Sequence, residues 1–373
     1  MNYFQRLLFL VINSLFVAKY SIRIGLNPFI TTLLYCLFSV IILWIVKKNT
    51  KINFKQLKTT YIGSIVFISI GIALLNYFIN PLNLQVDRWS AIHNFIQNLF
   101  GGIYPYSAHT HLGGYGSPFP IWQVFHIPFY LLGNVGLGML FSFILLAAFL
   151  VWFFEEYYKP LIFMILICIS PAFWYEVAVR SDLIYNFMFC LITIGFLFRK
   201  KYSIQHQSVW LGVLCGLFLS TRFSIIIPFA IYLFPDFIKA GIKQKIIFSL
   251  VAILVFILTF LPLIFWNYNT LFFFKYNPFI LQTRQGSMLE VIIIAILGLF
   301  LSLKWKENFS YCSSFISITL IILVAATFLH RMISDGFNAG LFDSAYDITY
   351  LNMALPFILF SISSPKQFKK KSL

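Results

Sequence analysis

Long apolar runs alternate with short polar segments along almost the whole chain, and most of these runs are about as long as a membrane crossing. A helix of roughly 20 apolar residues spans the hydrocarbon core of a bilayer, so each run predicts a transmembrane helix. Ten such helices are predicted at residues 59–79, 135–154, 160–178, 183–198, 207–220, 223–235, 246–266, 288–303, 309–328 and 346–363. Two further runs, 4–18 and 24–46, predict a hairpin ahead of them. We therefore expect an all-α, polytopic bundle of about ten to twelve spans.

The composition supports a membrane protein and excludes a soluble enzyme. Of the 373 residues, 60% are apolar and 10% are charged, whereas a soluble domain carries roughly 25% charged residues. The five cysteines stand inside apolar runs and form no CxxC pair, so neither a disulfide framework nor a zinc site is predicted.

Basic clusters between the apolar runs predict the orientation of the chain. They lie at residues 47–58, 199–201, 239–245, 304–306 and 366–371. Lys and Arg collect in cytoplasmic loops, and all of these clusters are cytoplasmic if residues 80–134 form a large outer first loop. The net charge of +16 then reflects orientation, so we expect membrane lipids as partners and no nucleic acid. The predicted location is a bacterial-type inner or plasma membrane, crossed many times.

The chain is expected to have two parts. Residues 1–58 are predicted to form an N-terminal hydrophobic hairpin followed by a basic cytoplasmic loop. Residues 59–373 are predicted to form the main membrane domain, which includes the outer loop. No low-complexity linker divides this second part, so we treat it as one unit.

Acidic residues gather on the predicted outer side, which makes that side the place to look for a site. Seven of the 11 acids fall there: Asp87, Glu176, Asp182, Glu290, Asp335, Asp343 and Asp347. The rule that places basic residues inside does not require acids outside. Ionisable groups close to membrane depth are costly and tend to mark functional sites.

Asp87 is the leading candidate for chemistry in the outer loop. It follows directly on a predicted span, at the level of the lipid head groups, where a carboxylate can act as general base for a hydroxyl or amine. The alternative is structural. Residues 89–100 have the pattern of an amphipathic helix in the membrane interface, with Trp89, Ile92 and Phe95 on one face, and Asp87 could be its N-cap.

Two histidines in the same loop raise the question of a metal. His109 and His111 are two residues apart in a Gly-rich segment, and with Asp87 they could ligate a divalent cation. We interpret them instead as surface or hydrogen-bonding side chains, because the spacing is a weak signal. The metal requirement stays open at this stage.

Several cations on the predicted outer side are suited to binding phosphate. Arginine clamps phosphate oxygens well at an interface, although any one of these side chains could equally extend its charged end toward lipid head groups. The candidates are Arg88, Arg180, Arg222, Lys275 and Arg284. A base, phosphate-binding cations and an apolar environment together favour a lipid-phosphate substrate.

The order of these features resembles the type-C (GT-C) integral membrane glycosyltransferases, which include the protein O-mannosyltransferases and the lipid A aminoarabinose transferases. In that superfamily an acidic residue opens the first outer loop, as Asp87 does here. The further matching positions over roughly residues 59–363 are Ser117-Pro118, Pro171, Arg180, Asp182, Arg222, the segment from Pro262 to Gln285, Tyr350 and Pro356.

The resemblance implies a GT-C-like fold and an inverting transfer of a sugar from a polyprenyl-phosphate donor on the outer face. The acceptor would be an envelope glycan, lipid or protein. Asp87 would deprotonate the acceptor or help to hold a metal ion, and Arg222 and Arg284 would bind the departing phosphate. Asp182 and Tyr350 are implied to belong to the same substrate site. No cofactor is required by this scheme, and a divalent cation is an open alternative.

Two other functions fit some of the same features. A polysaccharide polymerase or ligase acting on undecaprenyl-linked chains would share the long outer loop and the outer arginines. A transporter or flippase for lipid-linked substrates would instead favour internal repeats and charges near the midplane, and the sequence has neither. We therefore rank glycosyl transfer first and transport last.

Overall fold

The described part of the chain consists of helices joined by loops. The structure is a computed structural model, and it describes residues 2–47, 54–283, 288–305, 308–343 and 346–364. No strand occurs in these segments, and their only β-type pairing is one bridge between His109 and Tyr115. The all-α prediction is therefore confirmed for the described chain.

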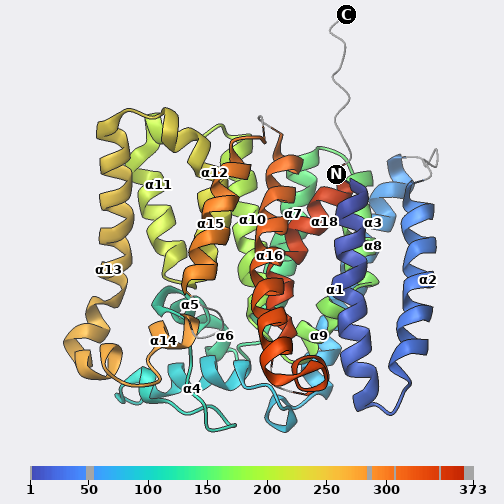
Figure 1. Ribbon diagram of the computed structural model, residues 1–373, viewed down its shortest axis with the longest axis horizontal. Helices are drawn as coiled ribbons and strands as arrows, with labels where there is room; N and C mark the ends of the chain where they lie inside the picture. Colours follow the sequence, from blue (N-terminus) through green and yellow to red (C-terminus); the bar gives the residue numbers. More distant parts are fainter. Residues whose placement is uncertain (1, 48–53, 284–287, 306–307, 344–345, 365–373) are drawn as a thin grey trace, which may run out of the picture.

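Most of the long helices run side by side (Figure 1), and the chain passes back and forth between the two ends of the bundle. The longer helices are α1 (Asn2–Arg23), α2 (Pro28–Lys47), α3 (Phe54–Phe78), α7 (Leu137–Phe154), α8 (Tyr158–Cys168), α10 (Leu183–Arg199), α11 (Ile204–Leu219), α12 (Ile226–Lys239), α13 (Ile242–Phe272), α15 (Met288–Ser302), α16 (Phe309–Asp335) and α18 (Leu355–Ser363). Every predicted span therefore contains a helix.

Six helices of the described chain are long and apolar enough to cross a membrane. They are α1, α2, α3, α7, α13 and α16. A seventh crossing results if α8 and α9 (Pro171–Ala178), which meet at a bend of 66°, count as one broken span. The remaining apolar helices are shorter, so the number of ten to twelve crossings stays a prediction.

The apolar helices leave much of their surface uncovered, as lipid-facing helices do. The side chains of Phe29, Phe265 and Ile333 are more than 80% exposed. Because a bilayer offers no hydrogen bonds to the backbone, only segments that satisfy their own N–H and C=O groups can stand in it. The fold is therefore that of an integral membrane protein.

The first helix belongs to the interior of the bundle. Asn13 in α1 accepts a hydrogen bond from Ser170 (2.7 Å), and Lys19 donates to the carbonyl of Tyr346 (3.0 Å). The second helix of the hairpin is mainly exposed. The functional division expected after residue 58 stays a prediction.

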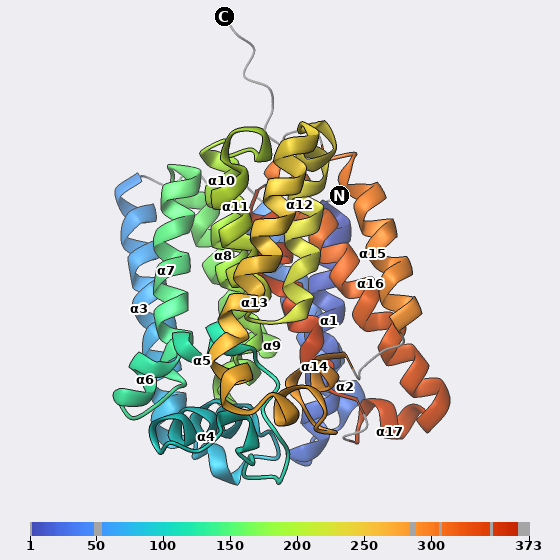
Figure 2. The same cartoon turned by 90° about the vertical axis from the view of Figure 1, so that its left-hand side faces the viewer.

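The segment 80–134 packs at one end of the bundle. Its elements are η1 (Pro81–Asn83), α4 (Arg88–Phe100), η2 (Pro105–Ser107), α5 (Pro120–Phe125) and α6 (Ile127–Leu131). In Figures 1 and 2, α4 lies across the end of the bundle opposite to the start of α1. The short elements α14 (Pro278–Thr283), α17 (Phe337–Leu341) and η4 (Ile348–Met353) lie toward this same end, and η3 (Phe223–Ile225) precedes α12.

The apolar stretch 119–133 does not form one helix. It breaks into α5 and α6 at His126, and its beginning is tied to the turn between α11 and α12. The N–H groups of Phe119 and Ile121 donate to the carbonyls of Thr221 and Ser220, both at 3.1 Å. These bonds bring the outer-loop segment against the residues that carry Arg222.

Candidate functional site

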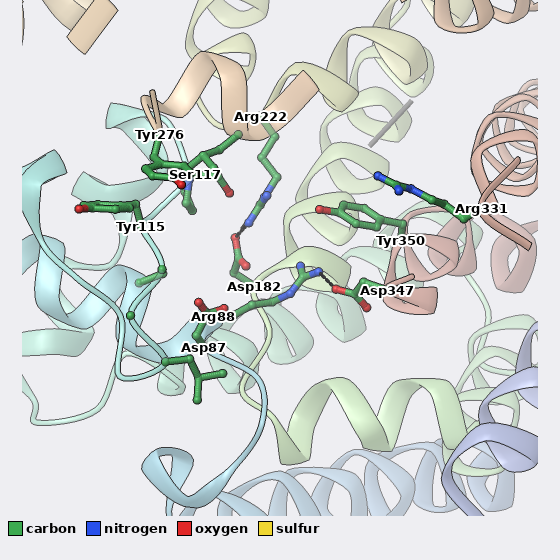
Figure 3. Close-up of a pocket in the computed structure, with 16 residues that line it drawn as sticks. Asp87, Arg88, Tyr115, Ser117, Asp182, Arg222, Tyr276, Arg331, Asp347 and Tyr350 are labelled. Carbon is green, nitrogen blue, oxygen red and sulfur yellow. Dashed lines mark hydrogen bonds and ion pairs between the residues drawn. The ribbon is translucent and has the colours of Figure 1, made fainter. Parts of the chain in front are cut away.

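A cavity of about 780 Å³ opens at the end of the bundle where α4 lies. Its wall comes from segments far apart in the sequence: the outer-loop segment, the turns before α10 and α12, the loop after α13, the end of α16 and the start of η4. Figure 3 shows the charged side chains around this space. The lining residues are Asp87, Arg88, Ala91, Leu112, Gly113, Gly114, Tyr115, Ser117, Pro118, Asp182, Arg222, Tyr276, Leu281, Arg331, Asp347 and Tyr350.

Asp87 stands at the N-cap position of α4, but its side chain makes no capping hydrogen bond. Its Oδ2 accepts a hydrogen bond from the hydroxyl of Thr110 (2.8 Å), and that hydroxyl in turn accepts from the N–H of Gly114 (2.9 Å). The carboxylate is therefore positioned on the cavity wall by a neutral donor, and it forms no ion pair with any described residue. The side-chain capping considered for Asp87 is not made, and its role as a general base stays a prediction.

Gly114 must be small for this arrangement. A Cβ at residue 114 would lie 3.0 Å from Oδ2 of Asp87 and 3.3 Å from the Thr110 hydroxyl oxygen. A side chain there would crowd the pair and displace the carboxylate. The Gly-rich stretch is thus used for a close approach of backbone to the candidate base.

Arg88 points to the opposite side of the cavity and forms an ion pair with Asp347 (2.6 Å). Its guanidinium also donates to the hydroxyl of Thr349 (2.8 Å) and lies over the ring of Tyr350 at 5.4 Å. Burial opposes the charged form of Arg88, but the negative charge of Asp347 outweighs it, and the pKa of Arg88 lies well above its ordinary value. The pair joins the outer-loop segment to the last segment of the chain.

Asp182 and Arg222 form a second ion pair (2.5 Å), deeper in the wall. Oδ2 of Asp182 also accepts from the indole N–H of Trp122 (2.7 Å), whereas its Oδ1 is buried with no partner among the described residues. Burial disfavours the carboxylate, but the charges of Arg222 and Arg88 prevail and lower the pKa of Asp182 below its ordinary value. The Asp182 carboxylate therefore stays ionised at neutral pH.

Aromatic rings and one further cation complete the cavity wall. Tyr115 and Tyr276 stack with ring centroids 5.5 Å apart and an angle of 13° between the planes. Arg331 comes from the end of α16, and its side chain is 44% exposed. The cavity thus offers aromatic faces, ionised carboxylates and guanidinium groups together.

The structure brings together five of the sequence-predicted site residues. Asp87, Arg88, Asp182, Arg222 and Tyr350 all line the same cavity. Their convergence depends on contacts between the segment 80–134 and residues well beyond it in the sequence, from Trp122 with Asp182, 60 positions apart, to Arg88 with Asp347, 259 positions apart.

Other sequence-predicted residues lie elsewhere. Arg180 is away from the cavity and donates to the carbonyls of Asn76 (2.5 Å) and Ile79 (2.8 Å), where it holds the end of α3. Lys275 is exposed, with its ammonium 5.2 Å from the ring centre of Tyr276. Arg284 lies outside the described residues.

The histidines serve the fold of the loop. His111 uses both ring nitrogens, with Ser90 Oγ at 2.7 Å from Nδ1 and the carbonyl of Leu84 at 2.9 Å from Nε2. His109 is exposed and lies beside Tyr115. No group of three possible ligands for a metal ion occurs in the described part of the chain. Asp87 and these histidines do not fit a metal site here, and we derive no step through a metal.

The sequence did not single out Asp347 or Arg331 as a site residue, although Asp347 was among the acids predicted on the outer side. Asp347 is three residues before Tyr350, on the side of the chain that carries most of the acids. Its role becomes evident only from the pair with Arg88, because the two residues are 259 positions apart.

No family model, curated protein or solved structure matches this chain. The fold and the site nevertheless define a class: an integral membrane protein built from helices, with a charged, aromatic-lined cavity at one end of the bundle.

Proposed function

We propose that this protein is a glycosyltransferase of the GT-C type, which transfers a sugar from a polyprenyl-phosphate donor to an envelope acceptor on the outer face of the membrane. One observation carries the proposal: the carboxylate of Asp87, which has no ion-pair partner among the described residues, and the guanidinium groups of Arg88, Arg222 and Arg331 line one cavity. Such a cavity can activate a hydroxyl and bind a phosphate in the same space.

The orientation of the chain supports an outer location for the cavity. The described basic residues of the loops between α10 and α11 and between α12 and α13 lie at the other end of the bundle (Figures 1 and 2). With those loops in the cytoplasm, the cavity opens where lipid-linked sugars and acceptors meet. In this reading, the segment 80–134 is the large outer first loop, and the bundle crosses the membrane about ten to twelve times.

The proposed reaction is a direct displacement at the anomeric carbon. Asp87 accepts the proton of the acceptor hydroxyl as the acceptor oxygen attacks that carbon. The bond from the carbon to the phosphate oxygen breaks, its electron pair leaves with the polyprenyl phosphate, and the configuration inverts. Guanidinium groups stabilise the charge on the leaving phosphate, and Arg222 is the best placed of them because it is buried beside the cavity.

Purified protein in vesicles tests this proposal. The vesicles receive radiolabelled undecaprenyl-phosphate sugars with envelope acceptors, and label transfer is measured. We expect Asp87→Asn to lower kcat at least 100-fold, because the amide cannot accept the proton. Asp343→Asn is the matched control, since Asp343 is an acid outside the cavity, and it should transfer at the wild-type rate.

Near-normal transfer by Asp87→Asn would disprove the role of Asp87 as base. Transfer only from diphosphate-linked oligosaccharides would instead indicate the polymerase or ligase function. Movement of the intact donor across the bilayer without transfer would indicate a flippase.

A further inference from the structure

A second cavity, of about 940 Å³, lies at the opposite end of the bundle from the candidate active site. It is enclosed by the ends of α10, α12 and α15 and by the turn that leads into α11. We call it the basic-end cavity. Nothing in the proposed transfer reaction uses it, so its role is a separate question.

The charges around the basic-end cavity are mainly positive. Arg199 and Lys201 come from the end of α10 and the turn that follows, and Lys239 comes from the end of α12. Asp236 is the single acid in the lining, and its carboxylate already accepts a hydrogen bond from the N–H of Ile204. The cavity therefore favours an anion.

Two hydrogen-bond donors in the lining lack acceptors. Nη1 of Arg199 and the indole Nε1 of Trp305 are both buried and without a partner among the described residues. Arg199 pairs with Glu155 through Nη2 and lies over the ring of Trp152. Its Nη1 takes no part in the ion pair and has no acceptor among the described residues. Buried donors without acceptors are costly. Because both nitrogens are shielded from solvent, the charged side chains that line the cavity carry the argument for an anion.

Lys201 occupies a backbone position that favours glycine. Helix α10 ends with the N–H of Lys201 bonded to the carbonyl of Phe198 and the N–H of Tyr202 bonded to that of Leu197, which is the Schellman arrangement. The residue between these bonds is left-handed, with φ of 55° for Lys201. A lysine in the left-handed conformation is strained. A role for its positive charge in ligand binding would explain why lysine, and not glycine, stands at residue 201.

The stabilisation of helix ends by basic residues explains only some of the cations around the basic-end cavity. Cations in the last turn, such as Arg199 and Lys239, offset the negative end of a helix dipole. That effect does not require a lysine in the left-handed conformation at residue 201. A bound anion accounts for all of these features together.

We propose that the basic-end cavity binds a phosphate group, and that its natural source is the head group of an anionic membrane phospholipid. Phosphate oxygens match the lysine and arginine donors. The cavity opens at the basic end of a membrane bundle, and Tyr202, Tyr232 and Trp305 in its wall are the residue types that lie at the head-group level.

The test compares three single variants of the full-length protein in neutral detergent. Native mass spectrometry measures the retention of phosphatidylglycerol, and a titration measures the binding of inorganic phosphate. Lys201→Gly and Lys239→Ala should each bind phosphatidylglycerol about fivefold more weakly than wild type. Lys200→Ala is the matched control, because Lys200 is an exposed neighbour that does not line the cavity, and it should bind like wild type.

The thermal stability of Lys201→Gly separates binding from folding. Glycine relieves the left-handed strain, so this variant should melt at a higher temperature than wild type while it binds the lipid less well. If Lys201→Gly and Lys239→Ala weaken the binding of inorganic phosphate but not that of phosphatidylglycerol, the cavity binds phosphate and its natural ligand is a soluble phosphate. Equal binding of both probes by Lys201→Gly and wild type, or equal weakening by Lys200→Ala, would overturn the proposal.

Discussion

At the scale of single residues, the three carboxylates of the candidate site differ in what holds them. Asp182 and Asp347 are each paired with an arginine, and the pKa of each is lowered because the arginine charge outweighs the effect of burial. Among the described residues, Asp87 accepts one side-chain hydrogen bond, from the neutral Thr110 hydroxyl. A carboxylate bound to a guanidinium is a poor proton acceptor, so of the three carboxylates Asp87 is the one suited to the base role that we propose.

The pair of Asp182 and Arg222 provides the first stability prediction. Both side chains are more than 90% buried, so loss of one charge leaves the other uncompensated. We expect Asp182→Asn, which keeps an acceptor for Trp122, to lower the free energy of unfolding by about 3–5 kcal/mol. The double variant Asp182→Asn with Arg222→Met should be more stable than the single one. Unfolding in mixed detergent micelles measures both, and additive losses would show that the two charges do not interact.

The second prediction concerns pH and His126. This side chain is fully buried, donates from Nδ1 to the carbonyl of Trp122 (2.6 Å) and accepts at Nε2 from the hydroxyl of Tyr185. Burial lowers the pKa of His126 to about 4, so the folded state keeps it neutral at a pH where the unfolded chain binds a proton. The contribution of His126 to stability should therefore fall as the pH drops from about 6.5 to 4, by about 3 kcal/mol.

The control for this prediction is His126→Gln, which removes the titrating group. The free energy of unfolding is measured for both proteins across the same pH range. The value for wild type minus the value for His126→Gln should fall by about 3 kcal/mol between pH 6.5 and 4. An unchanged slope in His126→Gln would assign the acid sensitivity to other groups.

At the scale of elements, the close contact between α11 and α13 shows how small residues shape the bundle. Gly212 and Gly216 are one turn apart on α11. A Cβ on Gly216 would lie 2.6 Å from the carbonyl oxygen of Ala252, and one on Gly212 would lie 2.8 Å from that of Phe248. The two helices approach so closely that only glycine fits, which is how small residues drive helix packing in membranes. This packing supports the turn that carries Arg222.

The third prediction follows from this contact. Gly216→Leu should push α11 away from α13 and lower the free energy of unfolding by about 1–3 kcal/mol. Gly63→Ala is the matched control, because Gly63 lies in α3 with nothing within 4 Å of its virtual Cβ, and it should raise stability by up to about 1 kcal/mol. Thermal melting in detergent compares the two. Equal changes in melting temperature for Gly216→Leu and Gly63→Ala would argue against a close contact between α11 and α13.

At the scale of the whole molecule, the bundle has two chemically different ends. One end carries the cavity with Asp87 and its neighbouring ion pairs, and the other carries the basic-end cavity. Because basic loops stay in the cytoplasm, the two cavities should lie on opposite sides of the membrane. This separation allows the transfer site and the lipid site to be tested independently.

The fourth prediction tests that orientation by labelling. In a background with the half-buried Cys36 and Cys168 replaced by alanine, single cysteines are introduced at the exposed Ser107 and Lys243. A maleimide that cannot cross membranes should label Ser107→Cys in intact spheroplasts and Lys243→Cys only after permeabilisation. The opposite labelling pattern would place the candidate active site in the cytoplasm.

The sequence predicted the positions of the helices better than it predicted which residues line the cavity. Every predicted span contains a helix, because a run of apolar side chains is a local property of the chain. The expected end at Trp266 coincides with a break in α13, since Asn267 has non-helical dihedral angles. Other ends are less well predicted: α16 continues to Asp335, whereas the predicted span ends at residue 328. Arg180 looked equivalent to Arg222 in sequence, yet only Arg222 reaches the cavity.

The sequence by itself determined that this is an all-α membrane protein, which end of the bundle is basic, and that Asp87 and Arg222 are candidates for chemistry. These properties depend on composition and local pattern. The packing of the helices was needed to show that Asp347 pairs with Arg88, that His111 bonds within the loop, and that Asp87 accepts from Thr110 and forms no ion pair with any described residue. Such relations join side chains that are distant in sequence, and they exist only once the helices have packed.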